Sequence, residues 1–240
     1  MSELTRPEAA ADVPTFSVIS PSLNQGRYIG DCLASVALQG DHTYEHLVLD
    51  GGSTDETEAE VGRFPHARFI SLPDSGQSEA LNEGFSRARG RVICWLNTDD
   101  VLLPGAFDQA LKRLEAMGDR GYVTSHFLLV DDLQDLIELR RVPEFSSFLY
   151  RNGCVYLPTS GSFVTNNLSD SGISLKDDLH MIMDRDFHLQ LHAAGYEWAL
   201  VDRYLSAFRV HATNKSALQD SLNRSKGRNQ TEGARQRQQE

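Results

Sequence analysis

The stretch Val92-Ile93-Cys94-Trp95-Leu96-Asn97-Thr98-Asp99-Asp100 decides the fold of this chain. Its first five residues are apolar and begin with two β-branched side chains, which predicts a strand that is buried on both faces. Such a strand ends at the carboxyl edge of an open α/β sheet, where these folds bind their ligands. Two adjacent carboxylates at that edge repel each other unless a cation lies beside them. Mg²⁺ and Mn²⁺ prefer carboxylate oxygens and often bridge to phosphates, so the stretch predicts a site for a metal and a phosphorylated ligand.

Strands and helices alternate along the chain on both sides of this stretch. We expect strands at 16–20, 46–50, 68–72 and 92–96, and helices at 28–38, 53–64, 78–88 and 104–117. Ser53 and Glu56 form a capping-box pattern, which predicts that the second helix begins at Ser53. Strands separated by helices of about three turns form βαβ units with parallel strands. The first half therefore predicts a Rossmann-like, nucleotide-binding unit.

The regular alternation ends after residue 120. We expect strands at 122–130 and 136–142, a short helix at 145–150, a helix around 185–194, and strands at 198–201 and 205–210. The whole is interpreted as an α/β fold with a mostly parallel central sheet flanked by helices and a mixed second half. One domain covers 15–215, with a nucleotide-binding half at 15–120 and an acceptor half at 121–215. Residues 1–14 are expected to form a loose leader, and the polar segment 216–240 a disordered tail.

Composition excludes several classes of function. The 240 residues carry 34 acidic and 23 basic side chains, for a formal net charge of -11. Such a surface repels nucleic acid and anionic lipid, so we expect no nucleic-acid partner. No apolar run approaches the ~20 residues of a transmembrane helix, and the first residues do not resemble a signal peptide. Cys32, Cys94 and Cys154 lie far apart, which favours reduced thiols and a cytoplasmic location.

Four loops with polar residues should meet at the carboxyl edge of the predicted sheet. They are Pro21-Ser22-Leu23-Asn24, Asp50-Gly51-Gly52-Ser53-Thr54-Asp55, Asp74-Ser75-Gly76-Gln77-Ser78-Glu79-Ala80-Leu81-Asn82-Glu83-Gly84 and Asn97-Thr98-Asp99-Asp100. In their order and spacing, over about 16–215, these loops resemble the signatures of family 2 glycosyltransferases with the GT-A fold. The resemblance implies an inverting transfer of a sugar from a nucleoside-diphosphate donor. The residues that it assigns to the nucleotide are Pro21, Ser22, Asn24, Tyr28, Asp50, Asp74, Gln77, Asn82 and Asp99.

The resemblance also implies a metal site and a general base. Asp100 is the expected ligand of Mn²⁺ or Mg²⁺, with Asp99 nearer the ribose and His211 as a further metal ligand. A divalent cation would stabilise the charge on the departing diphosphate. The acceptor hydroxyl needs a base, and Asp184 and Asp186 point about 200° apart on a helix, so only one can face the crevice. The resemblance favours Asp184, and Asp186 stays open.

Other interpretations of these residues exist. Asp99-Asp100 could form a solvated turn or cap the following helix, Asp74 and Gln77 could only cap a helix, and His211 could be structural. A nucleotidyltransferase would need a Gly-rich, basic loop after the first strand, where this chain has only Gly26 and Arg27. A dehydrogenase would need a GxGxxG motif after that strand, which this chain lacks. A non-catalytic module that binds a sugar nucleotide or a partner protein remains an alternative.

The function expected from the sequence is therefore a metal-dependent inverting glycosyltransferase of glycan or glycoconjugate biosynthesis. Its donor would be a UDP-, GDP- or dTDP-sugar. Its acceptor would be a hydroxyl of a glycan, a lipid-linked molecule or a small molecule, selected by residues around 156–186. A lipid-linked acceptor would bring the protein into peripheral contact with a membrane.

Overall fold

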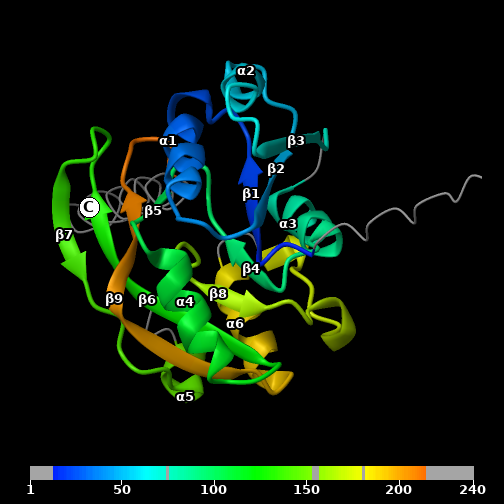
Figure 1. Cartoon of the computed structure of the whole chain (residues 1–240), viewed down its shortest axis with the longest axis vertical. Coiled ribbons are helices and arrows are strands. Elements are labelled where there is room, and N and C mark those ends of the chain that lie inside the picture. The colour runs from blue at the N-terminus through cyan, green and yellow to red at the C-terminus, as the bar shows by residue number, and fades with distance from the viewer. Residues whose placement is uncertain (1–12, 74–75, 153–156, 180–181, 215–240) are drawn as a thin grey trace, which may run out of the picture.

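The structure is a computed structural model that describes residues 13–73, 76–152, 157–179 and 182–214. Its first half alternates strands and helices, as the sequence predicts (Figure 1). The strands are β1 (Phe16–Ser22), β2 (Tyr44–Asp50), β3 (Ala67–Ser71) and β4 (Val92–Trp95), and the helices are α1 (Gly26–Ala37), α2 (Thr57–Val61), α3 (Gln77–Arg87) and α4 (Ala106–Glu115). The predicted leader and tail lie almost entirely outside the described residues.

The second half holds longer strands and two further α-helices. Its elements are β6 (Gly121–Val130), β7 (Leu136–Arg140), α5 (Ser147–Arg151), β8 (Phe163–Thr165), α6 (Met183–Ala193) and β9 (Glu197–Arg209). The short strand β5 (Val101–Leu102) lies between β4 and α4 in the chain and pairs with β9. Short 3₁₀ turns lie at Ser169–Ser171 and Asp177–Leu179. Among the described residues, no helix has both the length and the apolar character needed to cross a bilayer.

One sheet joins both halves, with the strand order β3-β2-β1-β4-β8-β6-β9-β5 and β7 paired to the side of β6. The four strands of the first half pair in parallel, and β8 pairs antiparallel with both β4 and β6. Two antiparallel steps restore the original direction, so β6 and its parallel neighbour β9 run the same way as β1 to β4. The carboxyl ends of β1, β2, β4, β6 and β9 therefore reach the same edge. This arrangement brings the second half to the predicted ligand edge.

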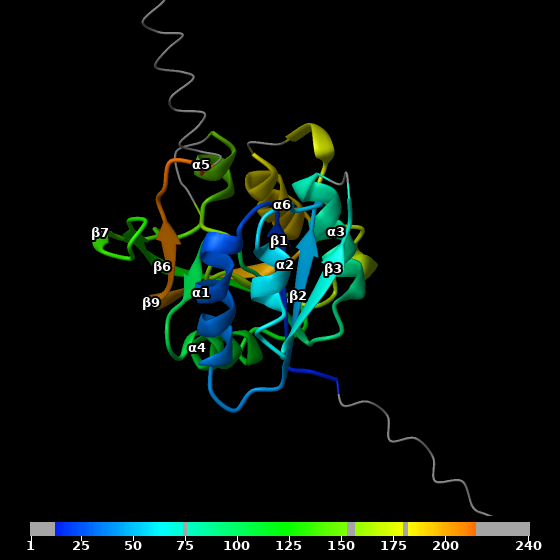
Figure 2. The same cartoon turned by 90° about the horizontal axis from the view of Figure 1, so that it is seen from above.

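Alternating side chains of the buried strands supply two cores on opposite faces of the sheet. Val18 of β1 belongs to a cluster with α1 and α4, whereas Ile19 belongs to a cluster with α3 and α6. The helix α3 packs very closely on its face, because a Cβ at Gly84 would lie 2.4 Å from Cγ2 of Ile19. Figure 2 shows α6 beside α3, where Ser78 Oγ lies 3.5 Å from Met183 Sδ. The packing of α3 therefore fixes the position of the first turn of α6.

Three local predictions were wrong. Ser53 does not cap a helix, because α2 begins at Thr57 and the carboxylate of Asp55 accepts the Thr57 N–H at 3.0 Å. The short strands β5 and β8 were not predicted, since two or three residues carry no periodic signal. The two strands expected at 198–201 and 205–210 form one strand, β9. Its pairing with β6 skips Asp202 and Arg203, which explains the polar interruption in the sequence.

Candidate active site

The loops after β1 and β2 are interlocked at the carboxyl edge. The backbone N–H of Asn24 donates to Ser53 Oγ at 2.7 Å, and the Asn24 side-chain oxygen accepts the Thr54 N–H at 2.9 Å. Asn24 adopts a left-handed backbone with φ of 53°, which short polar residues tolerate. The two loops therefore form one rigid wall of the site.

The Asp50 side chain builds this wall from within. One of its carboxylate oxygens accepts the N–H groups of Gly52 and Ser53 at 3.0 and 2.7 Å, and the other accepts the Ser53 hydroxyl at 2.5 Å. Asp50 is also only 2% exposed. Asp50 therefore shapes the loop 51–53, and its expected contact with the nucleotide stays a prediction.

Ser22 offers the wall an unused polar group. Its Oγ is buried, and no described residue forms a hydrogen bond with it. The neighbouring Pro21 carbonyl accepts the Thr98 hydroxyl at 3.2 Å, which ties the first loop to the turn after β4. A buried hydroxyl without a partner is costly, so a bound ligand is a plausible source of its hydrogen bond. The assignment of Pro21 and Ser22 to the nucleotide stays a prediction.

The two carboxylates after β4 lie in different environments. Asp100 is 1% exposed, and its oxygens accept the Ser160 hydroxyl at 2.5 Å and the Arg209 N–H at 3.0 Å. Burial, together with the charge of Asp99, raises the pKa of Asp100 well above its usual range, against the lowering effect of its hydrogen bonds. The Asp100 carboxylate is therefore bonded within the protein, and its expected role as the direct metal ligand stays a prediction.

Asp99 lies beside His211, which follows β9. The Asp99 carboxylate is 3.2 Å from Nε2 of His211, and the side-chain amide nitrogen of Asn214 lies 3.1 Å from each of these two atoms. Nδ1 of His211 lies 2.8 Å from the Thr213 hydroxyl, a contact that can fix the imidazole tautomer with Nε2 as an acceptor. The Asp99 oxygen, His211 Nε2 and the Asn214 amide nitrogen therefore form a triangle with sides of 3.1–3.2 Å.

This donor set suits a divalent cation. A carboxylate and a neutral imidazole are ordinary ligands of Mn²⁺, and such ions take their remaining ligands from water and substrate phosphates. The described residues contain no cluster of three or more His, Cys, Asp or Glu side chains placed to hold a metal. Asp99 and His211 would therefore supply two of the ligands of a cation bound here, and water or phosphate the others.

Tyr28 supports His211 from the side of α1. Its ring lies 4.4 Å from the imidazole ring, centre to centre, and its hydroxyl donates to the carboxylate of Asp132 at 2.6 Å. Burial and the hydrogen bond to Asp132 raise the pKa of Tyr28. The Tyr28 ring is packed against His211 and only 7% exposed, and its expected nucleotide contact stays a prediction.

The two carboxylates of α6 also separate. Asp186 accepts the side-chain amide of Gln190 at 2.5 Å, and Gln190 in turn donates to the Ser174 carbonyl at 2.8 Å. Asp186 is therefore committed to holding the segment before the helix. Asp184 lies in the first turn of α6, is partly exposed, and accepts the Arg185 N–H at 2.7 Å.

The third predicted loop contributes packing. Asn82 exchanges two hydrogen bonds of 2.8 Å with the backbone of Leu175, so its amide is used within the protein. These bonds hold Asn82 to the segment before α6, and its expected nucleotide contact stays a prediction. Gln77 begins α3, and its predicted contact remains untested. Asp74 lies outside the described residues.

Sequence reasoning missed three residues that complete the site: Ser160, Arg209 and Asn214. Ser160 follows no recognisable motif. Arg209 could have been suspected from its place at the end of the predicted strand 205–210, two residues before His211. Asn214 could have been suspected as a short polar residue three positions after His211.

Known proteins share this sequence pattern. The model of the family described as Glycosyl transferase family 2 matches residues 17–154. The hyaluronan synthase of Pasteurella multocida is 35% identical over 104 residues, which are 42% of this chain and 11% of that protein. The PGL/p-HBAD biosynthesis glycosyltransferase of Mycobacterium bovis (strain BCG / Pasteur 1173P2) is 38% identical over 94 residues, which are 37% of each chain. The chain thus spans well under half of the length of either relative.

Solved structures share the architecture. The crystal structure of S. aureus TarS 1-349 in complex with UDP-GlcNAc matches with a TM-score of 0.71 and 19% identity, covering 83% of this chain and 60% of that one. The complex of TarS 1-349 with UDP matches with a TM-score of 0.69, also at 19% identity, covering 82% and 61%. At this identity the likeness shows the fold alone, and it confirms the expected α/β GT-A architecture.

Proposed function

Because the chain belongs to glycosyltransferase family 2, we propose that it transfers a sugar from a nucleoside-diphosphate donor to a hydroxyl acceptor, with inversion at the sugar carbon. The single observation that carries this proposal is the Asp99–His211 pair at the shared carboxyl edge, beside the interlocked loops after β1 and β2. We propose that the product is a glycan or glycoconjugate, which the similarity to a hyaluronan synthase and to a PGL/p-HBAD biosynthesis glycosyltransferase supports.

The donor would lie along the wall formed by the first two loops. The buried hydroxyl of Ser22 supplies a hydrogen-bonding group, and the backbone of loop 51–53 lets a planar base approach closely. The complexes of TarS with UDP and UDP-GlcNAc support a nucleotide sugar as the donor. We leave the base and the sugar open, since the likeness to TarS concerns the fold.

Asp99 and His211 would hold the cation. This assignment exchanges the roles that the sequence predicted for Asp99 and Asp100. Mn²⁺ fits the mixed oxygen and nitrogen donors better than Mg²⁺, which seldom takes imidazole. When bound, the cation would supply positive charge to the departing diphosphate. Asp100 would keep the turn in shape through its bonds to Ser160 and Arg209, and Asn214 would give up its place between the two ligands.

Asp184 would accept the proton of the acceptor hydroxyl. An inverting displacement needs this base on the face of the sugar opposite the diphosphate. The family resemblance favours Asp184 for this role, and the bond of Asp186 to Gln190 lies on the side of the segment before the helix. The contact of Ser78 with Met183 holds this turn at the start of α3, and therefore near the same sheet edge.

The test is donor hydrolysis and transfer measured with a panel of UDP-, GDP- and dTDP-sugars and Mn²⁺. Asp184→Asn should abolish transfer while donor binding, measured by calorimetry, stays at the wild-type level. Asp108→Asn is the matched control, because Asp108 is an exposed carboxylate of α4 that pairs with His42. Wild-type rates in Asp184→Asn would refute the assigned base. Tight nucleotide binding without turnover under all acceptors would instead favour the non-catalytic module.

A further inference from the structure

Arg209 is a buried cation that contacts three parts of the site at once. Its side chain is 4% exposed, and it lies at the last position of β9. Its Nε donates to the Asp99 carbonyl at 3.1 Å, and its backbone N–H donates to the Asp100 carboxylate at 3.0 Å. Its guanidinium also lies 5.0 Å from the centre of the Tyr28 ring. Arg209 therefore grips the turn that carries Asp99 and the ring that supports His211.

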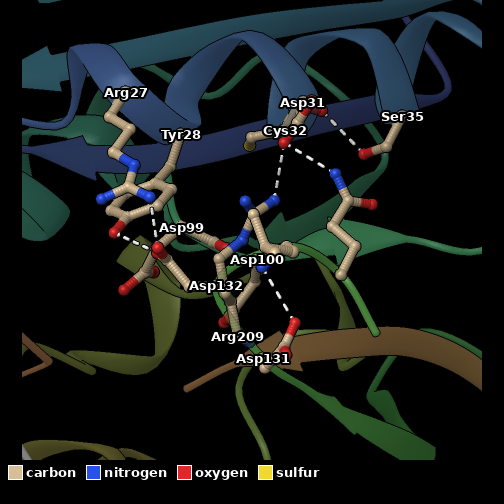
Figure 3. Close-up of polar contacts among 12 residues, drawn as sticks. Arg27, Tyr28, Asp31, Cys32, Ser35, Asp99, Asp100, Asp131, Asp132 and Arg209 are labelled. Carbon is tan, nitrogen blue, oxygen red and sulfur yellow. Dashed lines mark hydrogen bonds and ion pairs between the residues drawn. The ribbon is translucent and has the colours of Figure 1, made fainter. Parts of the chain in front are cut away.

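A carboxylate of α1 forms an ion pair with Arg209. Its terminal nitrogen donates to the carboxylate of Asp31 at 2.7 Å (Figure 3). Asp31 is about half exposed, and the same carboxylate oxygen accepts the side-chain amide of Gln134 at 2.7 Å. A buried guanidinium needs such a partner, because an uncompensated buried charge is strongly destabilising. Asp31 thus fixes the orientation of the guanidinium, although it lies outside the reacting groups.

The turn between β6 and β7 adds a second tie to α1. Asp132 accepts the Tyr28 hydroxyl at 2.6 Å and also pairs with Arg27 (Figure 3). Gln134, in the same turn, reaches Asp31 and has a left-handed backbone with φ of 69°. The turn therefore holds both of the α1 side chains, Tyr28 and Asp31, that flank Arg209.

We propose that Arg209 and Asp31 act as a positioning pair that sets the separation of Asp99 and His211. In this arrangement Arg209 holds the backbone of Asp99 on one side and the Tyr28 ring on the other. The Tyr28 ring in turn packs on the imidazole of His211. The proposal rests on the proposed function, because it concerns the residues that would bind the cation there. Neither Arg209 nor Asp31 would touch the donor or the cation.

A purely structural role makes a different prediction. If Arg209 and Asp31 only stabilised the fold, removing Asp31 would lower the melting temperature and leave the affinity of the remaining folded protein for metal unchanged. A positioning role predicts a loss of metal affinity at temperatures where the variant is fully folded. Removing one outer partner of a metal ligand typically costs about 10–100-fold in affinity.

The experiment titrates Mn²⁺ alone into the full chain by calorimetry, for the wild type, Asp31→Ala, Arg209→Lys and the double variant. Asp31→Ala should weaken Mn²⁺ binding about tenfold, and Arg209→Lys should weaken it by a similar factor. The double variant should bind Mn²⁺ about as tightly as each single variant does, because the two residues act as one unit. Asp108→Ala, which removes an exposed carboxylate partner of His42, is the matched control and should bind Mn²⁺ as the wild type does.

Steady-state kinetics supply a second readout. Asp31→Ala should raise the KM for the Mn²⁺–donor complex by about the factor lost in metal affinity, and leave the KM for the acceptor unchanged. Wild-type Mn²⁺ affinity in folded Asp31→Ala, or full additivity in the double variant, would overturn the positioning pair alone. Failure of the wild-type protein to bind Mn²⁺ would overturn both this pair and the proposed metal site.

Discussion

Replacing Asp99 and Asp100 one at a time should separate metal binding from stability, although the residues are adjacent. In Asp100→Ala, the Ser160 hydroxyl and the Arg209 N–H both lose their buried acceptor. Leaving a buried donor without a partner costs about 1–3 kcal/mol, so for these two donors we expect a loss of about 2–6 kcal/mol in the free energy of unfolding. In Asp99→Ala, the Asn214 amide keeps its contact with His211, so the loss should stay within about 1 kcal/mol.

The metal affinities should follow the opposite order. Asp99→Ala removes a proposed ligand, so Mn²⁺ binding should fall by at least about a hundredfold. Asp100→Ala should bind Mn²⁺ within about tenfold of the wild type wherever the variant is folded, because Asp100 contributes through the shape of the turn. Urea unfolding monitored by circular dichroism gives the stabilities, and calorimetry gives the affinities. A large loss of Mn²⁺ affinity in folded Asp100→Ala, with wild-type affinity in Asp99→Ala, would refute the exchanged roles.

The remaining predictions concern stability. Burial lowers the pKa of His188 to about 3, against 6.5 for the free side chain, so the unfolded state binds the proton first and stability falls as the pH drops from 6.5. At pH 5 this should lower the free energy of unfolding by about 2 kcal/mol. Urea unfolding at pH 7 and pH 5 should therefore show a smaller change in the free energy of unfolding for His188→Gln than for the wild type. An equal change in both proteins would contradict this. Gly84→Ala should destabilise by about 1–3 kcal/mol, because its Cβ would meet Cγ2 of Ile19 at 2.4 Å. Its control, Gly30→Ala in α1, meets only ordinary contacts and should stabilise by about 0.5–1 kcal/mol, so equal effects of the two changes would refute the packing argument.

The sequence predicted the first half well because its signals are local. The apolar strand 92–96 and the loops after β1 and β2 are each bounded, within a few residues, by the glycine, proline or polar residues that mark their ends. The strand pairing of the second half could not be predicted in this way, because it depends on β8, a strand of three residues that carries no periodic signal. That strand reverses the pairing direction twice, and so brings the end of β9 to the same edge as β4. The position of His211 beside Asp99 therefore follows from tertiary pairing that no single segment of sequence reveals.

The location of the site could be predicted from the sequence more readily than the contacts that each of its side chains makes. Motifs mark which side chains reach the edge, but a role depends on which way each side chain turns. Tyr28 turns to Asp132, which is 104 residues away, and Asp99 meets His211, which is 112 residues away. Asp50 instead turns back on its own loop, a choice open to any Asp that precedes glycines. The direction in which each of these side chains points depends on the assembled fold.

The most direct test of the account is a crystal of the protein grown with Mn²⁺ and a nucleoside diphosphate, with anomalous scattering recorded at the manganese edge. The account predicts an anomalous peak bound by the Asp99 carboxylate and Nε2 of His211, with the diphosphate on its open side and the Asn214 amide displaced. A peak on the Asp100 carboxylate, or a nucleotide bound with no manganese between Asp99 and His211, would contradict it.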